Sequence, residues 1–274
     1  ALNEINSLEA LSLPLGKASV ILRSRLAEQA ELVQNLAEKD ENLVEYRFFL
    51  KDALTRAKYQ MAPELEDLAN DLARSGGDAW SRLQEAISST VSAEWDPATG
   101  EKKTVIALRD LAHDPDRSIR ERAYRAELAA WESMKIPLAA SLNGVKGFAI
   151  TVDKRRGWQS ALDKAAYQSR ITRKTLDALI SVMEGSLPLF RRYLKAKSRI
   201  LGIERCAFYD LFAPVGRATK KWSWEESRDF IIDKFSAFDP AMGNFARHAF
   251  TFSWIDAEGR EGKIGGAYCT DFPL

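Results

Sequence analysis

The chain offers few side chains whose type and spacing could form a self-contained catalytic or metal site. His113 and His248 are its only histidines, and neither stands in an HExxH motif or in a His/Cys ligand pair. An isolated histidine is more often a hydrogen-bonded surface or core residue than a ligand, so we assign both a structural role. We therefore predict no catalytic and no metal-binding residue within these 274 residues.

Two further enzyme motifs are excluded by their residues. GREGKI, residues 259–264, resembles a phosphate-binding loop, but Ile264 stands where a Ser or Thr would hold magnesium. GxSxG does not occur, so a serine hydrolase triad is not predicted.

The only cysteines, Cys206 and Cys269, are far apart, which argues against a disulfide framework and favours a reducing compartment. We therefore expect the protein to be located in the cytoplasm.

The balance of charge argues against polyanionic partners. Lys and Arg number 40 and Asp and Glu 39, so no net field favours nucleic acid or an anionic membrane. The opening ALNEINSLEALSL has no basic segment before a long apolar core, and no later run approaches membrane-spanning length. We expect neither nucleic acid nor a membrane as partner. The charge-rich stretches RSIRERAYR (117–125) and DKRRGW (153–158) are interpreted as solvated faces.

Helical periodicity runs through most of the chain. Apolar residues recur at helical spacing among Arg, Glu and Lys from Ile21 to Tyr59, as a core-facing stripe requires. Start signals follow further on, since Pro63 fits a first turn and Asp116 and Thr172 fit N-caps. Ser223 with Glu226 and, later, Asp239 with Pro240 predict two more helix starts, and Pro137 is expected to kink or divide a long helix.

Two stretches break the helical pattern. Residues 91–108 contain Asp-Pro and Thr-Gly between β-branched residues, which indicates a hairpin or extended excursion. FSWIDAEGREGKIGGAYC predicts a second small hairpin near 252–270. We place an N-terminal helical domain at 1–90 and a second domain at 91–274.

Three segments stand out, at residues 156–163, 209–214 and 254–269. In order and spacing they resemble the oligoendopeptidase F family of zinc metallopeptidases, relatives of thimet oligopeptidase. Arg156-Gly157-Trp158 followed by Ser160-Ala161-Leu162-Asp163 is similar to that family's RGY-SALD segment. Tyr209-Asp210-Leu211 with Pro214 is similar to its YDL-x-x-P segment. Its WID, GK and GAYC hairpin is matched by Trp254-Ile255-Asp256, Gly262-Lys263 and Gly266-Ala267-Tyr268-Cys269.

The resemblance implies a mostly α, elongated, multi-helix metallopeptidase-type fold with a deep channel, and the hydrolysis of short unstructured peptides. It also implies zinc, held by both histidines of HExxH and a later Glu, with the motif's Glu as general base. This sequence reaches Leu274 without that motif. Residues 91–274 are therefore expected to form the front part of the peptidase domain, truncated before the zinc-binding motif. The parent protein is expected to be a zinc metalloendopeptidase and this chain alone to be inactive.

The resemblance also gives a role to the predicted terminal strand. It implies that Gly265, Gly266, Ala267 and Tyr268 bind the main chain of the substrate at an exposed strand edge. The alternative is a purely structural role: an ordinary hairpin with glycine in its turn and Tyr268 packed on the core. For the whole chain, the alternative is a non-catalytic helical binding or scaffold module. Peptide length, side-chain preference and oligomeric state stay open.

Overall fold

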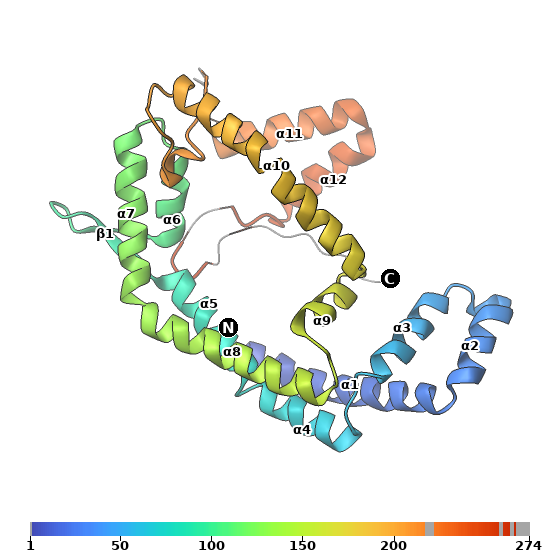
Figure 1. Ribbon diagram of the computed structural model, residues 1–274. Helices are drawn as coiled ribbons and strands as arrows, with labels where there is room; N and C mark the ends of the chain where they lie inside the picture. Colours follow the sequence, from blue (N-terminus) through green and yellow to red (C-terminus); the bar gives the residue numbers. More distant parts are fainter. Residues whose placement is uncertain (1, 217–221, 258–259, 264–265, 267–274) are drawn as a thin grey trace. The chain divides into compact units, whose positions relative to one another are not determined.

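The computed structural model describes residues 2–216, 222–257, 260–263 and 266, and these residues are mostly helical (Figure 1). The predicted mostly α class is thereby confirmed. The chain divides into two compact units, unit 1 from residues 1–85 and 135–187 and unit 2 from residues 86–134 and 188–274. Each unit thus combines two separate stretches of sequence, and the boundary between 90 and 91 stays a prediction. No described helix combines the length and apolar character that crossing a membrane requires.

Unit 1 consists of helices joined by short connections. Its complete helices are α1 (Leu2–Glu28), α2 (Ala30–Lys39), η1 (Glu41–Leu43), α3 (Arg47–Ala57), α4 (Pro63–Ala73), α8 (Lys135–Arg155) and α9 (Ala161–Gln168). It also holds the first parts of α5 (Gly77–Thr90) and α10 (Arg173–Ile200).

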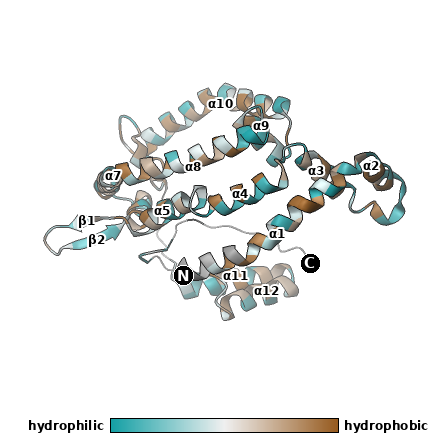
Figure 2. Ribbon diagram, turned by 90° about the horizontal axis from the view of Figure 1, so that it is seen from below, coloured by the Kyte–Doolittle hydropathy of each residue, from teal (hydrophilic) through white to brown (hydrophobic). Residues whose placement is uncertain are grey.

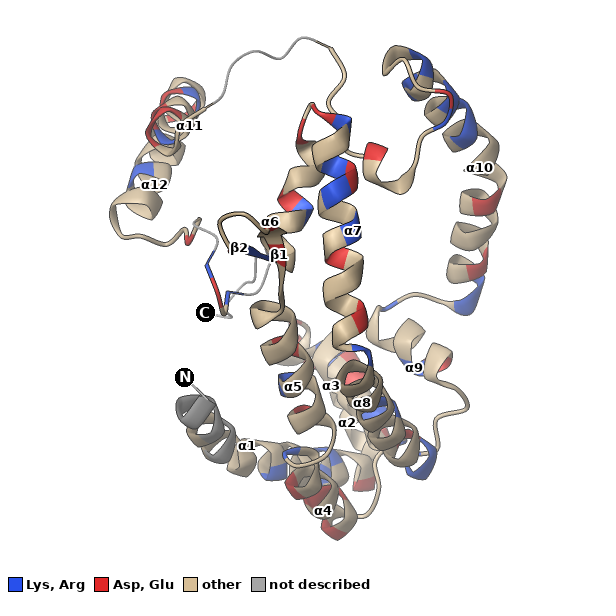
Figure 3. Ribbon diagram, turned by 90° about the vertical axis from the view of Figure 1, so that its left-hand side faces the viewer, with Lys and Arg blue, Asp and Glu red and all other residues tan. Residues whose placement is uncertain are grey.

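Unit 2 adds a small sheet to its helices. It holds the remainder of α5 and α10 together with β1 (Ser92–Asp96), β2 (Glu101–Thr104), α6 (Val105–Asp110), η2 (Leu111–His113), α7 (Arg117–Ser133), η3 (Phe208–Asp210), α11 (Trp224–Phe238) and α12 (Pro240–Thr251). Charges of both signs follow α7 along its length (Figure 3).

Local capping explains where several helices begin. The Asp116 carboxylate accepts a hydrogen bond from Ser118 N at 2.8 Å at the start of α7. Ser223 and Glu226 form the predicted capping box of α11, with reciprocal bonds of 3.1 and 2.9 Å. The division near Pro137 falls at Met134, because α7 ends at Ser133 and α8 begins at Lys135. Pro137 itself lies in the first turn of α8, where its missing N–H leaves no helical bond unmade.

The Arg156-Gly157-Trp158 segment fastens the end of α8 within unit 1. Arg156 donates to both carboxylate oxygens of Glu66 on α4, at 3.0 and 2.6 Å, and Glu66 is buried. Gly157 has a φ of 82°, which lets the chain leave the helix. Trp158 then stacks on Tyr59 with ring centroids 3.6 Å apart. The Ser160 side chain accepts from Asp163 N and begins α9.

The hairpin predicted at 91–108 is confirmed as the antiparallel pair of β1 and β2. Its strands are coloured mostly toward the hydrophilic end in Figure 2, as EKKT in β2 requires. Val91 and Val105, at the base of the hairpin, pack with Ala130 of α7 in a buried cluster. In the hairpin predicted near 252–270, the described residues hold turns and irregular backbone but no strand, and 258–259, 264–265 and 267–270 lie outside the described residues.

Gly144 marks a close approach within unit 1. A Cβ at this position in α8 would overlap the indole of Trp80 on α5, whereas a Cβ at Gly147, one turn later, would meet nothing within 4 Å. The two glycines therefore differ in their neighbours while sharing one helix.

We expect Gly144→Ala to destabilise the protein by about 1–3 kcal/mol, because the indole must shift to admit the methyl group. Gly147→Ala is the matched control and is expected to stabilise by up to about 1 kcal/mol, through helix propensity. Urea unfolding of both variants measures the difference. Equal free energies of unfolding in the two variants would contradict the contact.

Candidate peptide-binding site

The predicted substrate strand is described at one residue. Gly265, Ala267 and Tyr268 lie outside the described residues, so their assignment stays a prediction. Gly266 has a φ of 116°, a conformation that residues with a Cβ rarely adopt. A Cβ there would meet no atom within 4 Å. The backbone conformation, and not a neighbouring atom, is therefore what favours glycine at this position.

A cavity of about 450 Å³ adjoins Gly266 in unit 2. It is lined by β2, by α6 and by the segment from Asp256 to Lys263. Its charged lining residues carry both signs: Lys102, Lys103, Asp110, Asp256, Arg260, Glu261 and Lys263. Such a surface offers donors and acceptors to the main chain of an extended peptide.

Asp256 organises the segment that leads to Gly266. Arg260 donates from its two terminal nitrogens to the two Asp256 carboxylate oxygens, at 2.7 and 2.8 Å. Lys263 Nζ donates to the Asp256 carbonyl at 2.5 Å. The hydrogen bond from Arg260, with the nearby charge of Lys263, lowers the pKa of Asp256 to about 2. The carboxylate is therefore ionised at neutral pH, and it closes a turn between residues 256 and 263.

Two further contacts tie this turn to helices of unit 2. Gly262 N donates to Ser89 O near the end of α5 at 3.0 Å, and Gly262 has a φ of 81°. Trp254 packs edge-on against Phe245 of α12, with ring centroids 5.7 Å apart. The residues that matched the WID and GK segments thus position the backbone that carries Gly266.

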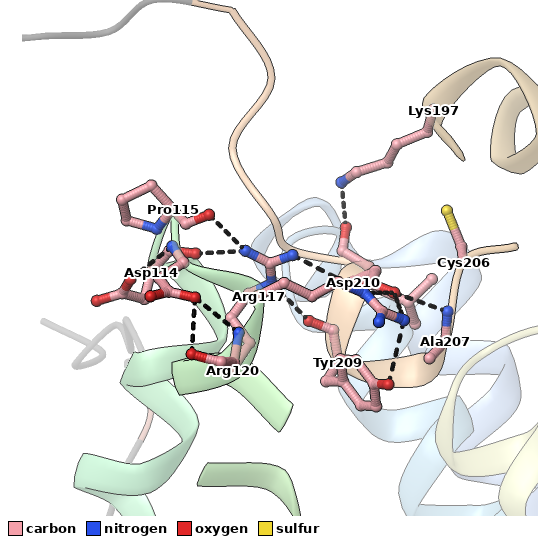
Figure 4. A network of polar contacts seen from close by, with 12 residues as sticks. Asp114, Pro115, Arg117, Arg120, Lys197, Cys206, Ala207, Tyr209 and Asp210 are labelled. Atoms are coloured by element: carbon pink, nitrogen blue, oxygen red, sulfur yellow. Dashed lines mark hydrogen bonds and ion pairs between the residues drawn. The ribbon is translucent and has the colours of Figure 1, made fainter. Parts of the chain in front are cut away.

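The YDL segment forms a buried charge network in the same unit (Figure 4). Asp210 has no exposed surface, and its carboxylate accepts from Arg120 Nη2 at 2.9 Å and from Arg117 Nε at 3.2 Å. Ala207 N donates to the same carboxylate at 2.9 Å. Arg120 also donates to the carbonyls of Tyr209, Asp114 and Pro115. The network joins the start of α7 to η3, about 90 residues later in the chain.

The network keeps Asp210 ionised despite its burial. Burial by itself raises the pKa of this carboxyl, but the hydrogen bonds from Ala207, Arg117 and Arg120 outweigh it and hold the pKa below its ordinary 3.8. A charge removed from water in this way is tolerated only with such partners.

The interpretation of the two charge-rich stretches as solvated faces is wrong for Arg120 in the first and Arg156 in the second. Arg120 is 3% exposed, and Arg156 donates to the buried Glu66. Arg122 and Arg125 on α7 are exposed, as expected. The available signal was the spacing of Arg117 and Arg120, which places them one turn apart on the same helix face.

The two histidines lie among aromatic rings. His113 is 5.3 Å from the Phe212 ring and His248 is 4.9 Å from that of Phe252. In the described part of the chain, no three His, Cys, Asp or Glu side chains are arranged to hold a metal ion. These residues do not fit the zinc that the resemblance implies, and no chemical step is assigned to them.

The sequence of this chain is similar to those of known oligopeptidases. A family model described as Oligopeptidase F matches residues 26–92. The oligopeptidase PepF of Bacillus subtilis (strain 168) is 22% identical over 245 residues, covering 88% of this chain and 36% of PepF. The resemblance to oligoendopeptidase F is confirmed.

Two more proteins similar to this chain define how far the likeness extends. The group B oligopeptidase PepB of Streptococcus agalactiae serotype III (strain NEM316) is 27% identical over 159 residues, covering 58% of this chain and 26% of PepB. The crystal structure of oligoendopeptidase-F from Enterococcus faecium aligns with a TM-score of 0.61 at 20% identity, over 88% of this chain and 46% of the other. That structure shares the fold. The chain spans between 26% and 36% of the length of these two curated relatives.

We expect Asp210→Asn to destabilise the protein by about 3 kcal/mol at pH 7, because two guanidinium groups lose their buried counter-charge. The carboxylate's pKa is lower in the folded state, so its stabilisation is complete well above pH 3.8 and is lost as pH falls below that value. The difference between the wild type and Asp210→Asn should therefore shrink in acid. Urea unfolding at pH 7, 5 and 3 measures it.

Asp229→Asn is the control for this variant. Asp229 forms an exposed ion pair with Arg228 at 2.8 Å on α11, so its loss should change stability little at any of the three pH values. If Asp210→Asn lowers the free energy of unfolding no more than Asp229→Asn does, the buried network does not hold η3.

Proposed function

We propose that this chain is part of a zinc-dependent oligoendopeptidase that hydrolyses short unstructured peptides in the cytoplasm. The observation that carries the proposal is the likeness to PepF, which extends over 88% of this chain. The shared fold with the Enterococcus faecium enzyme supports it. The names of these relatives specify oligopeptidases, and the peptide substrate is carried over from them as part of the proposal.

The zinc ligands and the general base are proposed to come from residues outside these 274. The ligand set implied by the family is absent from this sequence, and the described residues bring no comparable donors together. The chain supplies the channel walls and the surface that receives the peptide. By itself it is expected neither to hydrolyse peptides nor to bind zinc stoichiometrically, and tight zinc binding by the chain alone would contradict the ligand argument.

The peptide is proposed to pair its main chain with Gly265, Gly266, Ala267 and Tyr268. An exposed strand edge binds a peptide through backbone groups and so tolerates varied side chains. Support comes from the cavity of mixed charge that Gly266 lines. Asp256 and Arg260, which close the preceding turn, line the same cavity as Gly266.

The alternative of a scaffold module without a catalytic partner is disfavoured by the exposed apolar surface. Large apolar side chains are exposed to solvent on several helices: Phe238 is 83%, Val182 68% and Phe245 65% exposed. A complete domain rarely leaves so much apolar surface in water. A cooperative melt with little binding of an apolar dye would favour the scaffold module.

Sequencing the source coding DNA beyond the codon for Leu274 tests the proposal directly. An in-frame HExxH within a few tens of codons, with a Glu further on, is the expected result. A stop codon directly after Leu274 would overturn the proposal that this protein hydrolyses peptides unaided.

We expect Gly266→Ala to weaken the binding of a labelled peptide to this chain by about tenfold, because alanine is strained at this φ and the backbone at residue 266 would leave its conformation. Gly100→Ala is the matched control, since Gly100 also has a positive φ, 72°, and no neighbour within 4 Å of a Cβ. Fluorescence anisotropy measures both. Equal losses in the two variants would contradict peptide binding at Gly266.

A further inference from the structure

A second cavity in unit 2 has the character of a side-chain-binding pocket. Its volume is about 550 Å³, within the range of small-ligand sites. Apolar and aromatic residues of α6, α7 and the segment around η3 form much of its lining: Leu108, Tyr124, Leu128, Trp131, Phe208 and Phe212.

The two aromatic residues around η3 are exposed although they are large and apolar. Phe208 is 64% exposed and Phe212 57% exposed. Phe208 lies 5.5 Å from the ring of Tyr124, and Phe212 lies 5.3 Å from that of His113. Both rings thus extend the aromatic wall of the cavity while keeping surface that an incoming apolar group can cover.

The backbone between these two aromatic residues is fixed by buried charge. Asp210 lies midway between them and is held by Arg117, Arg120 and Ala207 N. Lys197 Nζ donates to the Leu211 carbonyl at 2.6 Å (Figure 4). A wall held in this way loses little conformational freedom when a ligand binds, which favours affinity.

The one carboxylate in this cavity that is mostly buried, Glu127, is already compensated. Glu127 is 15% exposed at its side chain, and its Oε1 accepts from Arg109 Nε at 2.6 Å and from Trp131 Nε1 at 3.0 Å. The carboxylate therefore orients the indole and has its counter-charge in Arg109. Asp110 is exposed and lines this cavity as well as the one beside Gly266. The two cavities therefore adjoin at α6.

We propose that this cavity, the aromatic pocket, binds an uncharged aromatic or large aliphatic side chain of the peptide whose main chain lies beside Gly266. The proposal rests on the proposed function and adds a side-chain preference to it. The compensated Glu127 and the aromatic wall select an apolar side chain, and the shared border at Asp110 places the pocket beside the cavity at Gly266.

The pocket is tested first without a peptide. N-acetyl-phenylalanine amide and N-acetyl-alanine amide are titrated into the ¹⁵N-labelled chain, and the indole N–H signal of Trp131, identified through Trp131→Phe, reports binding. We expect the phenylalanine compound to bind at least about tenfold more tightly, from burial of its ring. Leu128→Trp fills the pocket and should abolish this difference. Leu142→Trp, at a similarly exposed leucine of α8, should leave it unchanged.

Equal binding of the two compounds, or full binding of the phenylalanine compound to Leu128→Trp, would overturn the pocket. Two peptides that differ only by Phe or Ala at one position then test its role. We expect the chain to prefer the Phe peptide, and Phe212→Ala to remove that preference while Phe238→Ala keeps it. Binding of both peptides without preference overturns the aromatic pocket and leaves the proposed function standing. Binding of neither peptide overturns both the peptide-binding surface and the pocket's role in it.

Discussion

Burial of the Asp210 carboxylate sets the geometry of unit 2. A charge without exposed surface requires partners that replace water, and Asp210 finds them in Arg117 and Arg120 of α7. Since Arg120 also donates to the carbonyls of Asp114 and Pro115, the turn before α7 is fixed by the same residue. The position of η3 relative to α7 follows, and with it the wall of the aromatic pocket. Glu66 and Arg156 make an analogous connection in unit 1, between α4 and the end of α8.

Apolar packing alone would fix η3 on α7, and α4 on α8, less precisely than these ion pairs do. The buried apolar residues in the described chain are mainly alanines and valines, while many phenylalanines, leucines and tryptophans are exposed. Small side chains let helices approach but place few directional constraints on them. Bidentate arginine–carboxylate pairs are directional, so they add a defined relative placement of segments that lie far apart in the sequence.

The sequence predicted the helices better than the site. Asp116, Ser223 and Asp239 begin helices as predicted, because capping depends on residues two or three positions apart. The burial of Arg120 was missed, since its partner Asp210 lies 90 residues away and helical periodicity treats an arginine as a surface residue. The aromatic pocket was missed for the same reason: Trp131 and Phe212 line one cavity only after α7 and the segment around η3 are brought together. The expectation for Gly266 came from the family resemblance, and its positive φ is a property that spacing alone does not give.

The segments that carried the resemblance have a common physical character. Arg156 and Asp210 each form a buried ion pair, and Asp256 closes a turn with Arg260. None of these groups is free to act on a substrate, because each is occupied by its partner. The likeness in these segments therefore reflects the positioning of backbone rather than chemistry at these side chains. In unit 2, Asp256 positions the turn that leads to Gly266, and Asp210 positions the aromatic residues beside it. Both places border a cavity. Under the proposed function this chain places the peptide, so its effect on activity should be sought in substrate affinity and side-chain preference.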